Sequence, residues 1–134
     1  MVDNPLVRKM HIKPGYRLLL LNAPDGYLPR LQPLPEGIDL IQVPDGPVDV
    51  VHLFVKDKAE LEQHASTAIN AVKPGGLLWM SYPKKSSKVK TDLTRDIGWE
   101  VVTNAGWTGI AQVSIDATWS ATRFRPAEDV GRRS

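Results

Sequence analysis

Short runs of hydrophobic residues recur along the chain, separated by segments rich in proline, glycine and charged residues. Runs of about four to eight apolar residues between turn residues are typical of strands that are buried on both faces of a sheet. We therefore expect strands at residues 17–21, 38–43, 49–55 and 77–82. The second run alternates moderately between apolar and polar positions, which places it at an edge of the sheet.

Apolar residues at helical spacing lie between these strands. Asp57 and Glu60 have the spacing of a capping box, and the apolar stripe that follows them predicts a helix over residues 58–72. Other helices are predicted at residues 5–10, in a short segment that begins at Pro24, and from residue 91 or 92 to 106, with Leu93, Ile97 and Val101 facing inward. Trp99 lies off this last stripe, so we expect it to be partly exposed.

The alternation of helices with the first four strands predicts parallel pairing through right-handed crossovers. Residues 107–116 and 119–125 are expected to form two further strands, which a tight connection makes antiparallel. The predicted fold class is therefore α/β, a small doubly wound, mostly parallel sheet of order 2-1-3-4 with a C-terminal antiparallel strand pair beyond it. Residues 1–126 form a single domain in this prediction, and residues 127–134 form a flexible C-terminal tail.

The composition is that of an ordinary globular protein. A chain of 134 residues, 42% hydrophobic and 24% charged, is long enough for one domain with a self-supporting core. The absence of cysteine excludes disulfides and thiolate metal sites and suits a cytoplasmic location, which we expect. The sequence contains no recognisable signal peptide or membrane helix, so no membrane association is expected. A net charge of +2 is too small to require nucleic acid, which is only a weak candidate partner.

The candidate binding site follows from the predicted topology. In open α/β sheets, ligands bind outside the carboxyl ends of the strands, and the helix starts at this edge attract anions. The residues expected there are Asn22, Pro24 and Asp25 after the first strand, Lys56 after the third, and Lys84, Lys85, Ser86 and Asp92 after the fourth. We predict that they bind a small anionic ligand or a protein partner, in a monomer or a homodimer.

Several polar residues allow two interpretations. The lysines and serines of residues 84–90 could hold a phosphate, a carboxylate or a nucleic-acid backbone, or they could belong to a solvated surface loop. His52, inside the third strand, is interpreted as a neutral core imidazole rather than a catalytic base. Turn and capping duties explain Asp25, Asp57 and Asp92 more simply than a carboxylate cluster does. We therefore assign no catalytic residue, and no two histidines have the spacing of metal ligands.

Three segments resemble a shortened class I methyltransferase-type Rossmann fold. They are Lys13-Pro14-Gly15 before the first strand, Asp49 at the start of the third, and the VKPGGLL run from Val72 to Leu78 before the fourth. The segments IKPGYRLLLLNAPDGY, WMSYPKKSS and DATWSATRF resemble more closely a family of small bacterial proteins that is known only as a domain of unknown function. That resemblance covers nearly the whole chain and implies no particular activity.

The methyltransferase resemblance implies a site for S-adenosylmethionine (SAM), but the sequence departs from the family's pattern. Residues 22–26 keep a single glycine, where the family has a glycine-rich turn that lets the methionine part of SAM approach the backbone. The second strand leads to Gln42 instead of the acidic residue that would hold the ribose hydroxyls. We therefore expect no cofactor and a non-catalytic anion- or partner-binding module; the alternative is a divergent SAM-dependent methyltransferase.

Overall fold

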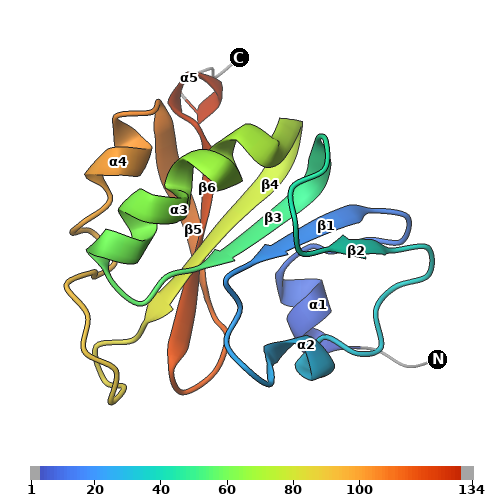
Figure 1. Ribbon diagram of the computed structural model, residues 1–134, viewed down its shortest axis with the longest axis horizontal. Helices are drawn as coiled ribbons and strands as arrows, with labels where there is room; N and C mark the ends of the chain where they lie inside the picture. The colour runs from blue at the N-terminus through green and yellow to red at the C-terminus, as the bar shows by residue number, and fades with distance from the viewer. Residues whose placement is uncertain (1–3, 131–134) are drawn as a thin grey trace.

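The computed structural model describes residues 4–130, without the side chains of residues 129 and 130. Its helices are α1 (Pro5–Lys9), α2 (Tyr27–Arg30), α3 (Lys58–Ala71), α4 (Glu100–Thr103) and α5 (Ala127–Val130). Its strands are β1 (Arg17–Leu21), β2 (Asp39–Ile41), β3 (Val48–Phe54), β4 (Val72–Pro83), β5 (Trp107–Ser114) and β6 (Trp119–Pro126). These strands form one sheet in the order β2-β1-β3-β4-β6-β5 (Figure 1).

The sheet has the predicted topology. Strands β2, β1, β3 and β4 pair in parallel, whereas β6 runs antiparallel to both β4 and β5. Leu18 of β1 lies opposite Val50 of β3, and Val50 lies opposite Leu77 of β4. Because β1, β2 and β3 are parallel, their carboxyl ends lie at one edge of the sheet. The strand order reverses between β1 and β3, as the sequence predicted.

Each face of the sheet carries its own apolar layer. Helices α3 and α4 pack on one face, and α1 and α2 pack on the other (Figure 1). The α3 helix starts where predicted, because the Asp57 carboxylate accepts a hydrogen bond of 2.9 Å from the backbone N–H of Glu60. Leu61, Ala65 and Ala68 then bury the inner stripe of α3 completely. This long helix packs on the central strands β3 and β4.

The helix predicted from residue 91 or 92 to 106 is wrong. Residues 84–99 are irregular, and only the short α4 forms after them. The Thr94 hydroxyl accepts hydrogen bonds of 3.3 and 3.1 Å from the backbone N–H groups of Asp96 and Ile97, a local pattern that competes with helix formation. Gly98 adopts a φ of +100°, which an α-helix does not contain.

This irregular segment changes the environment of its large apolar side chains. Ile97, predicted to face inward, is 64% exposed. Trp99, predicted to be partly exposed, is only 5% exposed and stands edge-on to Tyr82, with the ring centroids 5.5 Å apart. The indole N–H of Trp99 donates a hydrogen bond of 2.7 Å to the backbone carbonyl of Thr94, which closes a loop within the segment. The contacts of the Trp99 ring with Tyr82 and Phe124 hold this loop against the sheet.

Three shorter segments also differ from the sequence-based expectation. Strand β4, expected to begin at residue 77, begins at Val72, directly after α3. The helix expected to begin at Pro24 begins at Tyr27, because the Pro24 carbonyl closes a turn and Gly26 has a φ of +85°. Residues 127–130, expected in a flexible tail, form α5, and residues 131–134 of that expected tail lie outside the described residues.

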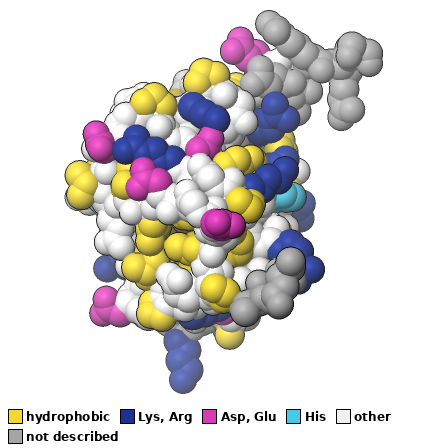
Figure 2. All heavy atoms as spheres, turned by 90° about the vertical axis from the view of Figure 1, so that its right-hand side faces the viewer, with side chains coloured by type: hydrophobic (Ala, Val, Ile, Leu, Met, Phe, Trp, Pro, Cys, Tyr) yellow, Lys and Arg dark blue, Asp and Glu magenta, His cyan; other side chains and the backbone are white. Residues whose placement is uncertain are grey.

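The surface carries mixed charges. Figure 2 shows a face on whose upper left basic side chains lie beside acidic ones, whereas several basic side chains gather along its right side. Arg17 of β1 forms ion pairs of 3.0 Å with Asp39 and 3.2 Å with Asp45. None of the helices in residues 4–130 combines the length and the apolar character that a membrane span requires.

Candidate functional site

A hollow of about 360 Å³ opens at the carboxyl ends of β1 and β2. The loop that leaves β1 forms one side of it, with Asn22, Pro24, Asp25 and Gly26, and Gln42 after β2 forms another. This is the position at which doubly wound sheets bind ligands. The structure therefore brings three of the predicted site residues together: Asn22, Pro24 and Asp25.

Asn22 fixes the shape of the loop. It is one of two described non-glycine residues with a positive φ, here +57°, a conformation that asparagine tolerates better than most residues. Its side-chain N–H₂ donates to the backbone carbonyl of Phe54 at 2.8 Å and to the Glu60 carboxylate at 3.3 Å. The loop after β1 is thus tied to the end of β3 and to the first turn of α3.

Two polar side chains in the hollow remain available for a ligand. Asp25 and Gln42 are exposed, and neither makes a side-chain hydrogen bond or ion pair with another residue in the part of the chain that the structure describes. A carboxylate and an amide together can accept and donate hydrogen bonds to a pair of hydroxyl groups. Gln42 thus occupies the place of the acidic residue expected in a nucleotide-binding sheet.

The basic residues of the predicted site do not line this hollow. Lys56 lies 3.8 Å from the Glu60 carboxylate, so it joins the network of Asn22 without lining the hollow. The Lys84 ammonium donates to the Ser114 hydroxyl at 2.6 Å, and its backbone N–H donates to Thr118. Lys84 therefore bonds to the β5–β6 hairpin. Lys85 and Ser86 are exposed, and neither lines the hollow.

Asp92 contacts α3 instead of starting a helix of its own. Its carboxylate accepts a hydrogen bond of 2.7 Å from the backbone N–H of Lys58, the first residue of α3. This acceptor satisfies one of the free N–H groups that every helix start presents. Together, Asp57 and Asp92 cap α3 from two different segments of the chain.

We expect Asp92→Ala to lower the free energy of unfolding by about 1 kcal/mol, the usual effect of losing a capping acceptor. Urea denaturation measures this difference. Asp25→Ala is the matched control, because Asp25 is exposed and caps nothing, and its effect should stay below about 0.5 kcal/mol. Equal stability of the two variants would contradict the capping role of Asp92.

His52 is a core residue, as the sequence suggested. It is 1% exposed, its Nε2 lies 2.6 Å from the Ser81 hydroxyl, and its Nδ1 lies 3.3 Å from the Tyr27 hydroxyl. Burial lowers the pKa of His52 to about 3, so the imidazole is neutral at pH 7. Its position inside β3 on the α1/α2 face keeps it away from solvent.

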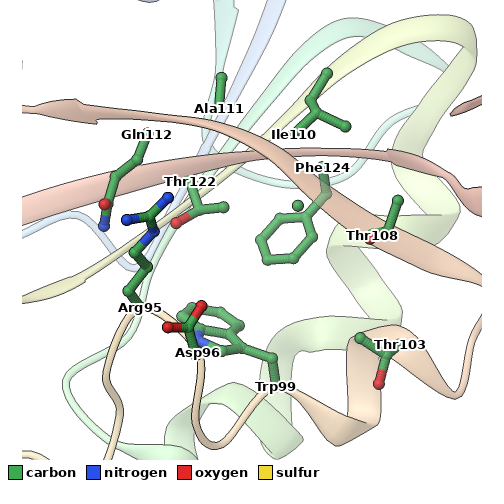
Figure 3. A pocket seen from close by; sticks show the side chains of 11 residues that line it. Arg95, Asp96, Trp99, Thr103, Thr108, Ile110, Ala111, Gln112, Thr122 and Phe124 are labelled. Carbon is green, nitrogen blue, oxygen red and sulfur yellow. The ribbon is translucent and has the colours of Figure 1, made fainter.

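A second hollow, of about 330 Å³, lies on the α3/α4 face between the irregular segment and the β5–β6 hairpin. Figure 3 shows Trp99 and Phe124 next to each other in its wall, with Arg95, Asp96 and Thr122 around them. The sequence pattern does not reveal this hollow, because it predicts a helix from residue 91 or 92 to 106. The only signals in the sequence were Thr94 and Gly98, residue types that interrupt helices.

Comparison with known proteins identifies relatives of the fold only. No protein-family model and no curated protein sequence matches the chain. Among solved structures, a complex of DhpI with S-adenosylhomocysteine (SAH) superposes with a TM-score of 0.61 and 16% identity, over 90% of this chain and 81% of that one. A SAM-dependent methyltransferase from Aquifex aeolicus gives 0.58 and 16%, over 89% and 86%. A ribosomal protein L11 methylase from Lactobacillus delbrueckii subsp. bulgaricus gives 0.59 and 9%, over 90% and 74%.

These neighbours correct one expectation. The single glycine of residues 22–26 predicts that no cofactor binds, but proteins of the same fold were solved with SAH or with SAM. The departure from the glycine-rich pattern therefore does not argue against a cofactor as strongly as the sequence suggested. The resemblance itself is confirmed: this chain has the Rossmann-like fold of the class I SAM-dependent methyltransferases, in a shortened form.

Proposed function

We propose that the protein is a divergent SAM-dependent methyltransferase whose adenosyl site is the hollow at the ends of β1 and β2. The observation that carries this proposal is the position of the hollow, at the switch point of a sheet with the methyltransferase strand order. Its volume of about 360 Å³ falls in the range of small-molecule sites. The non-catalytic module that the sequence favoured has no comparable support.

The residues of the hollow fit an adenosyl compound in chemical terms. Gln42 and Asp25 offer a hydrogen-bond donor and acceptors for the ribose hydroxyls, and Gly26 leaves the loop open beside them. Asn22 holds the loop in place through Phe54 and Glu60 and so preserves this arrangement. When bound, SAM supplies an electrophilic methyl group. The role of the protein is to bind SAM and to position the molecule that accepts the methyl group.

Isothermal titration calorimetry with SAH tests the site directly. We expect saturable binding to the wild type, and a roughly fivefold weaker affinity for Gln42→Ala, the effect of losing one neutral hydrogen bond. Asp25→Ala should weaken binding by a similar factor or more, because a hydrogen bond to a charged group is stronger. Gln63→Ala, at an exposed amide on α3, is the matched control and should bind like the wild type. Absence of heat at millimolar SAH would refute the proposal.

A further inference from the structure

A third hollow, of about 260 Å³, lies at the edge of the sheet where β1, β3 and β4 begin. Residues 11–16 before β1, Asp49 of β3, residues 73–77 of β4 and Arg123 of β6 form its walls. Figure 1 shows the parallel strands running from right to left, so their amino ends face the viewer in Figure 2, where basic side chains gather beside a histidine along one side. This amino-edge hollow is thus separate from the proposed adenosyl site at the carboxyl ends.

An irregular strand pairing brings Lys73 and Asp49 together in this hollow. Val48 lies opposite Val72 and Val50 lies opposite Leu77, so residues 73–76 of β4 face Asp49 alone. The Lys73 ammonium forms an ion pair with the Asp49 carboxylate, which also accepts a hydrogen bond of 2.7 Å from the backbone N–H of Arg17. Partial burial alone would raise the pKa of Asp49, but these hydrogen bonds outweigh it and lower the pKa. The carboxylate is therefore ionised and already paired.

Two further cations line the hollow without a carboxylate partner. Lys13 is exposed and Arg123 is half-buried, and neither side chain forms an ion pair or a hydrogen bond with another residue in the described part of the chain. The Nε atom of Arg123 is buried, so the guanidinium is partly removed from water and its charge is less screened. Among the described lining residues, three cations stand against one carboxylate, which leaves an excess of two positive charges.

Trp79 holds His11 at the rim of the hollow, near Arg123. The His11 and Trp79 rings stack with centroids 6.5 Å apart and planes 11° from parallel. The indole N–H of Trp79 donates a hydrogen bond of 3.1 Å to the carbonyl of Met10, which fixes the backbone directly before His11. Trp79 also lies opposite Arg123 in the register of β4 and β6, so their side chains share a face of the sheet. His11 is exposed and adds a ring N–H donor to the cations.

We propose that the amino-edge hollow binds the phosphate group of a small molecule. Lys13 and Arg123 balance its two negative charges, and His11 donates a hydrogen bond to a phosphate oxygen. These donors come from different segments of the chain and approach from several sides, which suits a tetrahedral group with at least three acceptor oxygens better than a planar carboxylate with two. This inference goes beyond the proposed function and does not depend on it, because the two hollows lie at opposite edges of the sheet.

Four probes test the ligand class in NMR titrations of ¹⁵N-labelled full-length protein. Inorganic phosphate and glycerol 3-phosphate carry the group, malonate carries two charges on planar carboxylates, and acetate carries one. We expect phosphate to shift the backbone N–H signals of Gly75 and Gly76, which line the hollow, and to bind about tenfold more tightly than acetate and about fivefold more tightly than malonate. If neither phosphate compound shifts these signals at about 10 mM, or if malonate binds equally well, the proposal is wrong.

The same titrations distinguish the two sources of a phosphate group. Tighter binding of glycerol 3-phosphate than of inorganic phosphate supports a phosphate ester as the ligand, because the part of the hollow beyond the phosphate then contributes to affinity. The opposite order supports free phosphate.

Variants test which cations hold the phosphate. Lys13→Gln should weaken inorganic phosphate about fivefold and Arg123→Gln about tenfold, because the Arg123 charge is the less solvated of the two. Arg123→Lys keeps the charge and should bind more tightly than Arg123→Gln. Lys90→Gln, at an exposed lysine that does not line the hollow, is the matched control and should bind like the wild type. Wild-type affinity in both Lys13→Gln and Arg123→Gln would overturn the proposal.

Asp49→Asn separates ligand binding from a structural role. Asparagine keeps an oxygen that can accept the hydrogen bond from Arg17, but it removes a negative charge and releases Lys73. The affinity for inorganic phosphate should therefore rise about threefold, while the melting temperature without phosphate falls by about 3 °C. A purely structural Asp49 would lower the melting temperature without raising the affinity. Unchanged or weaker phosphate binding by the folded variant would contradict the charge balance of the site.

Discussion

Acidification from pH 7 to pH 4 is expected to lower the free energy of unfolding by about 3 kcal/mol through His52 alone. The pKa of the buried imidazole is lowered to about 3, against about 6.5 in the unfolded chain. Between these two values the unfolded chain binds a proton that the native protein does not. The contribution of His52 is therefore fully present above pH 6.5 and is lost as the pH falls toward 3, by about 1.4 kcal/mol per pH unit.

Urea denaturation at several pH values measures the slope of the free energy of unfolding against pH. The variant His52→Gln isolates the contribution of His52 to this slope. Glutamine keeps a polar group between Ser81 and Tyr27 but does not titrate, so the slope between pH 6 and pH 4 should decrease by about 1.4 kcal/mol per pH unit in the variant. Because a core variant can fail to fold, NMR of the wild-type imidazole provides an independent check. A protonated His52 in the folded protein at pH 5 would show that the prediction is wrong.

Gly76→Ala is expected to lower the free energy of unfolding by about 3 kcal/mol. A Cβ at this position would lie 2.9 Å from the carbonyl oxygen of Asp49, 3.0 Å from that of Lys73 and 2.8 Å from a methyl group of Val72. Two of these neighbours are backbone atoms of β3 and β4, which cannot move apart without disturbing the pairing of the two central strands. Urea denaturation of the variant and of the wild type measures this difference in the free energy of unfolding.

Gly75 provides a control one residue away. A Cβ there would meet nothing within 4 Å, but φ is +79°, so Gly75→Ala should cost about 1 kcal/mol through backbone conformation alone. Gly75→Asn should cost less, because asparagine tolerates this region better than alanine. If Gly76→Ala is no more destabilising than Gly75→Ala, the close approach at Gly76 does not constrain the sheet.

The candidate site could be predicted from the sequence only in part. Topology predicts that Asn22, Pro24 and Asp25 share the carboxyl edge of the sheet, because they follow the first strand directly and the strand order reverses beside it. The partners of the lysines could not be predicted, since Lys84 meets Ser114 across 30 residues of chain. The same holds for Asp92, which caps a helix that begins 34 residues earlier.

The sequence by itself determined the strands apart from the start of β4, the long α3 helix and the order β2-β1-β3-β4 of the parallel strands. These features follow from local patterns, namely apolar runs, a capping acceptor and a helical stripe, whose lengths and order along the chain allow few topologies. The tertiary structure alone decided the course of residues 84–99 and the hollow that they form with the β5–β6 hairpin. There, the burial of Trp99 against Tyr82 and Phe124 outweighed the helical periodicity, because helix propensity is weak compared with the burial of a large aromatic side chain.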